Sequence, residues 1–226
     1  LLNVIILQML DRDDVPALKG SEKRVFYKRG SDDNEPRESE ASNFIIQEAL
    51  KLPEGEKLTI ISTGALTNVA SAVMLRPEIA GKIALYWLGQ TYDAEKDVWT
   101  GRGEFNLAND LDAFDALCDA KDLDFYIMPN NVSGKLRFHN ERSIAKLEGE
   151  TGIGAFIRER WKEPHYRFTS DGYWTMWDIA LVYALTNPGW AEMKLVDTPP
   201  ENLKRKVYVY TDIDEKRMEE KFWSIF

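Results

Sequence analysis

Hydrophobic residues recur along the chain with two spacings, one typical of helices and one typical of buried strands. Helical spacing predicts helices over residues 2–10, 42–50, 66–75 and 110–120. Short apolar runs between them predict strands over residues 57–62, 83–88 and 123–128. Strands that alternate with helices indicate a parallel sheet, and continuously apolar strands indicate that helices cover both of its faces.

The remaining segments extend this pattern. A polar stop at residues 11–14 precedes a short predicted strand at residues 15–18, and the charged stretch 19–40 is typical of a surface excursion. Beyond residue 128 we expect helices at 143–150, 154–162 and 177–185, then a strand at 205–211 and a final helix. Because no repeat or linker divides the chain, we predict one α/β domain over residues 1–226, with a mainly parallel, Rossmann-like open sheet flanked by helices.

Charge and composition exclude several classes of partner. The 226 residues carry 29 basic and 38 acidic side chains, a net charge of −9, without a local basic patch, which argues against nucleic acid. The longest apolar stretches, residues 1–10 and 82–89, are too short to cross a membrane. The single cysteine, Cys118, is expected to be a small buried hydrophobic residue. Homo-oligomerisation and a cytoplasmic or periplasmic location are left open.

Polar residues follow the predicted strands, at the positions where parallel sheets bind ligands. Residues 63–70 form a tight turn into a helix, Thr91 follows the next strand, and Glu104 and Asn106 come a few residues later. Taken alone, such residues are ordinary surface groups, but their place after buried strands makes them candidates. The glycines at 101 and 103 lack the third glycine of a dinucleotide-binding fingerprint.

Asp178 lies at the start of a strongly apolar predicted helix. A carboxylate there serves either as a helix cap, favoured by the positive helix end, or as an oxygen ligand of calcium. Of the two histidines, His139 and His165, the second lies near Trp161 and Trp174 and is the better pocket candidate, with a surface role as the alternative.

Five segments, in the correct order, resemble motifs of the nucleoside hydrolases of the inosine-uridine type. Residues 63–70 are similar to the GPLTN(I/V)A turn, with Ala65 in place of proline, and residues 88–91 to the MGG loop. Residues 104–112 resemble AEFN followed by DPEA, residues 178–180 the HDPLA segment, and residues 12–15 the RDDVP loop. The resemblance covers nearly the whole chain and implies hydrolysis of the N-glycosidic bond of ribonucleosides, or of a related N-riboside, to a sugar and a free base.

The resemblance also implies roles for individual residues. Glu104 and Asn106 match the residues that bind the ribose hydroxyls, while the Thr91 carbonyl and the Asp178 carboxylate match ligands of a calcium ion, Ca2+. The other aspartates of that metal site, including the base that takes a proton from water, belong to an N-terminal DTDxGxDD segment that this sequence lacks. We therefore expect a small-molecule nucleoside as substrate, calcium as cofactor, and a domain without its first strand and aspartate cluster.

Two expectations concern the aromatic neighbours of these residues. The histidine that precedes the motif aspartate in the family is Trp177 here, which cannot protonate a leaving base but would stack on one, with core packing as the alternative. If residues 104–106 are extended, Phe105 packs inward while its two neighbours face the sugar.

Two other functions compete with hydrolysis of nucleosides. One is a ribose- or nucleoside-binding relative that is catalytically impaired. The other is a glycoside hydrolase with two carboxylates, which ranks third because no second acid is tied by a motif to Glu104.

Overall fold

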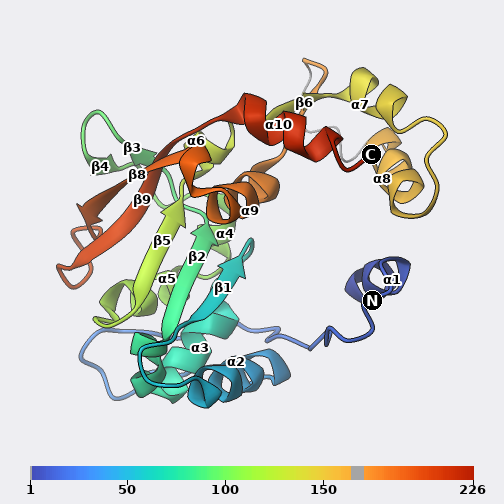
Figure 1. Ribbon diagram of the computed structural model, residues 1–226. Helices are drawn as coiled ribbons and strands as arrows, with labels where there is room; N and C mark the ends of the chain where they lie inside the picture. Colours follow the sequence, from blue (N-terminus) through green and yellow to red (C-terminus); the bar gives the residue numbers. More distant parts are fainter. Residues whose placement is uncertain (1, 164–170) are drawn as a thin grey trace.

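The computed structural model of the chain describes residues 2–163 and 171–226 (Figure 1). Its centre is a five-stranded sheet with the strand order β1-β2-β5-β9-β8. The first four strands are parallel, and β8 runs antiparallel to β9. These strands are β1 (Leu58–Ser62), β2 (Ile83–Leu88), β5 (Asp124–Met128), β9 (Lys206–Ile213) and β8 (Ala191–Asp197). The predicted α/β class with a mainly parallel sheet is confirmed.

Helices cover the sheet from both sides. On one face lie α2 (Glu40–Lys51), α3 (Thr67–Leu75) and α5 (Leu111–Asp119). On the other face lies α9 (Trp177–Thr186), with α10 (Glu215–Trp223) beside it (Figure 1). The remaining helical segments are α1 (Leu2–Met9), the 3-10 turn Pro77–Lys82, α4 (Phe105–Asn109), α6 (Asn130–Ser133), α7 (Asn140–Lys146), α8 (Gly152–Lys162) and the 3-10 turn Pro188–Trp190. Within the described ranges, every helix is too short or too polar to cross a membrane.

Two small antiparallel hairpins complete the fold. β3 (Tyr92–Asp93) pairs with β4 (Val98–Trp99), and β6 (Arg137–His139) pairs with β7 (Tyr173–Thr175). The second hairpin leads directly into α9. Between the two, the Met176 backbone N–H donates to the Leu136 carbonyl at 2.8 Å. The first hairpin follows the carboxyl end of β2 in the chain, and the second precedes α9.

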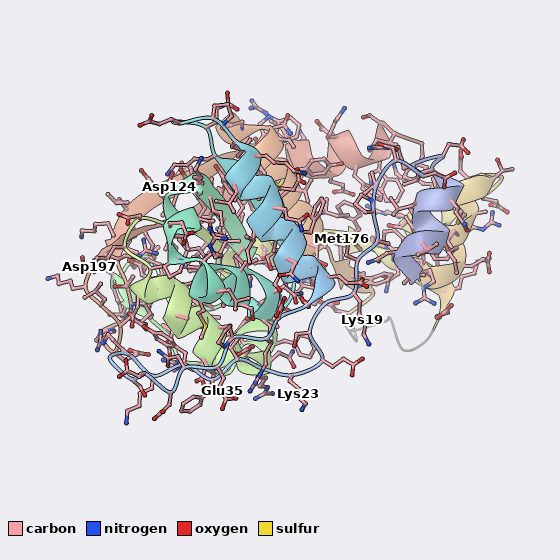
Figure 2. All side chains as sticks on the ribbon, turned by 90° about the horizontal axis from the view of Figure 1, so that it is seen from below. Lys19, Lys23, Glu35, Asp124, Met176 and Asp197 are labelled. Atoms are coloured by element: carbon pink, nitrogen blue, oxygen red, sulfur yellow. The ribbon has the colours of Figure 1, made fainter. Side chains whose placement is uncertain are left out.

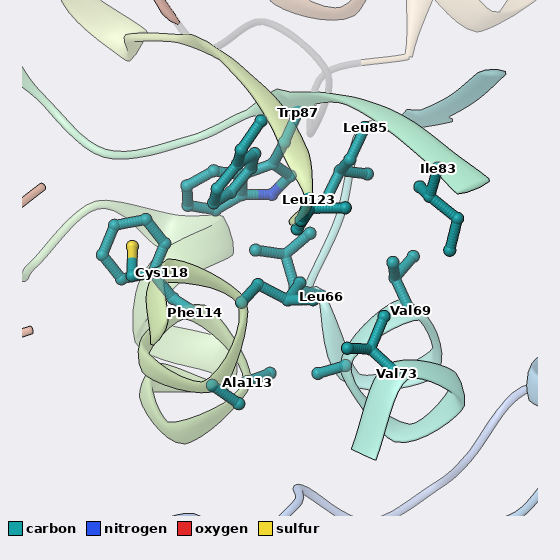
Figure 3. Close-up of a cluster of buried hydrophobic side chains, with 14 of the residues drawn as sticks. Leu66, Val69, Val73, Ile83, Leu85, Trp87, Ala113, Phe114, Cys118 and Leu123 are labelled. Carbon is teal, nitrogen blue, oxygen red and sulfur yellow. The ribbon is translucent and has the colours of Figure 1, made fainter. Parts of the chain in front are cut away.

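Trp87 of β2 is the largest side chain of the core between the sheet and α3 and α5 (Figure 3). Its indole Nε1 donates to the Gly64 carbonyl at 2.9 Å and so joins β2 to the turn after β1. A Cβ atom at Gly89 would lie 2.1 Å from the same ring, so this position requires glycine. Cys118 is fully buried in this cluster, as predicted, and burial raises the pKa of its thiol.

The charged segment that follows α1 runs along the outside of the molecule, where Lys19, Lys23 and Glu35 lie at the periphery (Figure 2). It is nevertheless anchored, because Val25 is buried in the core cluster. The predicted surface excursion is therefore a strap held against α5 by buried Val25 and by hydrogen bonds from Tyr27 to Asp112 and Asp119.

The predicted helices and strands match the structure with a few exceptions. Residues 15–18 form no strand, because no strand of the described chain pairs with them. β8, both hairpins, α4 and α6 were not predicted, and α7 begins three residues before the predicted start at 143.

Asp110 is a buried acid that connects three parts of the fold. As the N-cap of α5, its carboxylate accepts hydrogen bonds from Ala113 N at 3.1 Å and Thr67 Oγ1 at 2.5 Å. It also accepts from Val25 N at 3.1 Å. One carboxylate thus holds α5, α3 and the outer strap together.

Asp110→Ala should destabilise the fold more than loss of a helix cap alone. The substitution strands buried donors, which cost about 1–3 kcal/mol each, in addition to the roughly 1 kcal/mol of a cap. Asp214→Ala is the matched control, since Asp214 caps α10 at the surface through Arg217 N. Urea unfolding should give a lower midpoint for the first variant, and equal midpoints would contradict the connecting role of Asp110.

Candidate active site

A pocket of about 430 Å³ lies at the carboxyl ends of β1, β2 and β5. Thr63 follows β1 and Leu88 ends β2, so both belong to the edge where a parallel sheet binds ligands. The other walls come from the starts of α4, α6 and α9. The residues that line the pocket are Thr63, Leu88, Glu104, Phe105, Asn106, Asn130, Trp177 and Asp178. Four of the five site residues predicted from the sequence are therefore brought together.

Glu104 is the N-cap of α4, and most of its carboxylate is used by the backbone. Oε1 accepts from Asn106 N at 3.0 Å, while Oε2 accepts from Leu107 N at 3.0 Å and from Gln90 N at 3.1 Å. Each carboxylate oxygen accepts about two hydrogen bonds, so Oε1 keeps one position for a ligand. Glu104 thus fixes the loop after β2 against α4 and still presents an acceptor.

Asn106 is buried and connects the ends of two strands. Its Nδ2 donates to the Leu88 carbonyl at 2.9 Å and to the Thr63 carbonyl at 3.2 Å, which uses both amide hydrogens. Its Oδ1 receives no hydrogen bond from the described residues and remains an acceptor. A ligand that contacts Asn106 must therefore donate to it.

Phe105 does not pack inward as expected. Residues 105–109 form a helix rather than an extended segment, so Phe105 points away from the core and is 78% exposed. Its ring contributes to the pocket wall instead. The reason is that Glu104 caps a helix that begins at Phe105, so the alternation of an extended chain is absent.

Trp177 and Asp178 form the first turn of α9. Trp177 is half-buried, packs against the second hydrophobic cluster and also lines the pocket. The core packing expected of Trp177 is thus present, while stacking on a base stays a prediction.

The Asp178 carboxylate forms no hydrogen bond or ion pair with the described residues. The residue is exposed to solvent, yet the pocket walls surround its carboxyl group and raise its pKa by desolvation. The positive end of α9 favours the charged form, but no cation or donor offsets the desolvation. Asp178 thus lines the pocket and caps no helix, and its role as a ligand of calcium stays a prediction.

Thr91 does not line this pocket. Its carbonyl accepts from Thr100 N at 3.0 Å, in the hairpin that β3 and β4 form. Calcium takes six to eight oxygen ligands, whereas residues 2–163 and 171–226 contain no group of three or more acidic, histidine or cysteine side chains placed to hold a metal. The described donors therefore do not complete a calcium site.

Gln90 connects the two sides of the pocket. It is buried and adopts a left-handed backbone conformation with φ of 66°, which is rare for residues other than glycine. Its N–H donates to Glu104, its carbonyl accepts from Asn130 N at 2.9 Å, and its Oε1 accepts from Thr91 N at 2.9 Å. The starts of α4 and α6 are thus held at fixed positions by one residue.

The sequence reasoning missed Asn130 and the exposed ring of Phe105. Asn130 follows β5 directly, and its place at the end of a parallel strand was the available signal.

Asp14 pairs with Arg12 at 2.7 Å on the surface, which agrees with a structural role for the polar stop at residues 11–14. His165, the other pocket candidate, lies outside the described residues.

Comparison with solved structures identifies the same fold in several nucleoside hydrolases. An inosine-guanosine nucleoside hydrolase has a TM-score of 0.74 and 16% identity, with 99% of this chain and 84% of that chain covered. A plant nucleoside hydrolase, PpNRh1, has a TM-score of 0.71 and 17% identity, with 96% and 82% covered. The inosine-uridine preferring nucleoside hydrolase of Bacillus anthracis has a TM-score of 0.60 and 20% identity, with 82% and 64% covered.

Comparison with curated protein sequences finds no significant match. The sequence profile of the inosine-uridine preferring nucleoside hydrolases, however, matches residues 2–220. This match spans nearly the whole chain, including the segments that build the pocket. The chain therefore belongs to the inosine-uridine preferring nucleoside hydrolase family, and it is a hydrolase that acts on N-glycosyl compounds.

Proposed function

We propose that the pocket at the ends of β1, β2 and β5 binds a ribonucleoside and that the chain hydrolyses its N-glycosidic bond to ribose and free base. The observation that carries this proposal is the set of hydrogen-bond acceptors in the pocket. Glu104 Oε1, Asn106 Oδ1 and the Asp178 carboxylate all have accepting capacity left. Sugar hydroxyl groups are the matching donors.

The charges of the pocket suit the reaction as well as binding. When water attacks C1′, the C1′–N bond breaks, its electron pair leaves with the base, and the sugar gains oxocarbenium character. Backbone hydrogen bonds hold the Glu104 carboxylate in place, and Asp178 places a second carboxylate in the pocket wall. Negative groups near a developing positive charge stabilise the transition state. We assign no general base among the described residues.

Calcium remains part of the proposal through Asp178, which would supply one carboxylate ligand. When bound, the ion would acidify a water molecule. Because the described residues do not complete its coordination, no step above depends on it. The Thr91 carbonyl, as a second ligand, is likewise a proposal from the resemblance alone.

A nucleoside-binding relative without catalysis is the second candidate. It is favoured by the titratable side chains among the described residues of the pocket wall, which are the carboxylates of Glu104 and Asp178 and include no histidine. Turnover of inosine and uridine separates the two candidates, since the binding relative would retain affinity and release no base.

Asn106→Ala should reduce kcat/KM for a ribonucleoside by about one to two decades. The lost contact to a group of developing charge is worth about 1.5–3 kcal/mol. The variant also strands the Leu88 and Thr63 carbonyls, so its urea midpoint must be measured beside its steady-state kinetics. An unchanged kcat/KM with a ribonucleoside would count against the assignment.

Trp177→Ala should weaken binding of nucleosides with large bases by about 1–3 kcal/mol, on the scale of base stacking, and affect free ribose little. Trp177→His should increase turnover of substrates with poor leaving groups, because a general acid contributes about 10²- to 10⁴-fold. Inosine, uridine and an activated aryl riboside are the substrates to compare. Equal effects on all three, with a lower melting temperature, would show that Trp177 acts only as a core residue.

Asp178→Asn should be at least as stable as the parent at pH 7 in metal-free buffer. The pKa of Asp178 is raised by folding, so the folded state binds its proton more tightly than the unfolded state. Stability therefore falls as the pH rises through the carboxyl range, and the amide removes this cost. Thermal unfolding at several pH values should show the difference disappear once the carboxyl group is protonated.

Calcium chloride should reverse this order if Asp178 is a ligand. An ion that binds only the folded state stabilises it in proportion to the logarithm of its concentration, and the amide variant would lose that gain. Equal responses of both proteins to calcium would remove Asp178 from the metal site. A variant that is less stable than the parent at pH 7 without metal would contradict the desolvation argument.

A further inference from the structure

Asn130 is a pocket residue for which the resemblance implies no role. It begins α6 directly after β5, and its backbone is held at both ends. Its N–H donates to the Gln90 carbonyl at 2.9 Å, and its carbonyl accepts from Gly134 N at 2.9 Å. The side chain therefore projects from a fixed point of the wall that also contains Trp177 and Phe105.

Three neighbouring asparagines use their amide groups differently. Asn106 spends both amide hydrogens on strand carbonyls, and Asn131 binds the Tyr92 backbone through Oδ1 at 3.2 Å and Nδ2 at 3.0 Å. The Asn130 amide, although half-buried, forms no hydrogen bond with the part of the chain that the structure describes. A ligand that displaces water from it must replace the lost hydrogen bonds.

The chemistry of the pocket divides into two parts. Glu104, Asn106 and Asp178 offer acceptors, which suit the hydroxyl groups of a sugar. Trp177 and Phe105 offer aromatic surfaces, which suit a flat ring. The Asn130 amide provides donors and an acceptor in one plane, the arrangement that pairs with a base edge carrying an adjacent donor and acceptor.

We infer that Asn130 selects the base of the substrate by pairing its amide with a donor–acceptor edge, such as the N–H and carbonyl of hypoxanthine or uracil. This inference rests on the proposed function, because it assigns the base side of the same pocket. Substrates whose leaving group has no such edge gain nothing from Asn130.

The inference is tested first by binding of free bases, which does not require catalysis. Hypoxanthine and benzimidazole share a two-ring shape, but benzimidazole lacks the N–H and carbonyl pair. In calorimetric titrations, Asn130→Leu should weaken hypoxanthine about tenfold, the loss of roughly one hydrogen bond, and leave benzimidazole unchanged or tighter. Asn131→Leu is the matched control, and it should lower stability without changing the preference between the two.

Kinetics then distinguish failure of this inference from failure of the proposed function. Asn130→Leu should lower kcat/KM for inosine about tenfold and leave kcat/KM for p-nitrophenyl riboside unchanged. Asn130→Asp provides acceptors only, and the base edge of guanosine has two adjacent donors. This second variant should therefore favour guanosine over inosine. Equal losses on inosine and the aryl riboside overturn the inference while the hydrolase stands. If no nucleoside is hydrolysed but the hypoxanthine effect is present, hydrolysis as the proposed function fails, whereas the assignment of Asn130 to recognition of the base holds. A parent protein that binds neither free base overturns it.

Discussion

The pocket depends on the backbone of Gln90, which is held in a left-handed conformation between the two helices that form its walls. Such a conformation costs about 1–2 kcal/mol for a residue with a side chain. Hydrogen bonds to Glu104, Asn130 and Thr91 offset this cost. The positions of α4 and α6, and hence the width of the pocket, follow from this one residue.

The hydrogen bonds of the pocket residues are divided between the protein and a future ligand. Glu104 and Asn106 use most of their polar atoms to close the carboxyl ends of β1 and β2, so neither can move to meet a ligand. Glu104 Oε1 and Asn106 Oδ1 can each still accept a hydrogen bond, and the Asp178 carboxylate provides further acceptors. Such acceptors match hydroxyl donors of a ligand, and among the described residues that line the pocket Asn130, at the start of α6, adds an amide that forms no hydrogen bond with the protein.

Much of the fold could be predicted from the sequence because its parallel strands are short, continuous apolar runs between helices of clear period. β8 could not be predicted in this way, because Lys194 lies on the same side of the sheet as buried Val196 and pairs with Asp97 at 2.9 Å. The candidate residues Glu104, Asn106, Trp177 and Asp178 came from motifs, and the structure brings them together. The direction of Phe105 was predicted wrongly because the Glu104 cap begins a helix in a segment that was expected to be extended. Asn130 was missed because the sequence does not show which asparagine amides form hydrogen bonds within the protein.

Gly89 shows how the core constrains a loop of the active site. Its missing side chain is required by the indole of Trp87, which also holds the Gly64 carbonyl beneath the pocket. Selection at position 89 therefore acts on packing and not on chemistry, although the residue lies one position from the pocket-lining Leu88. An evolutionary path to a new substrate would have to keep this glycine and change the pocket wall at Phe105 and Asn130 instead, where the side chains line the pocket outside both core clusters.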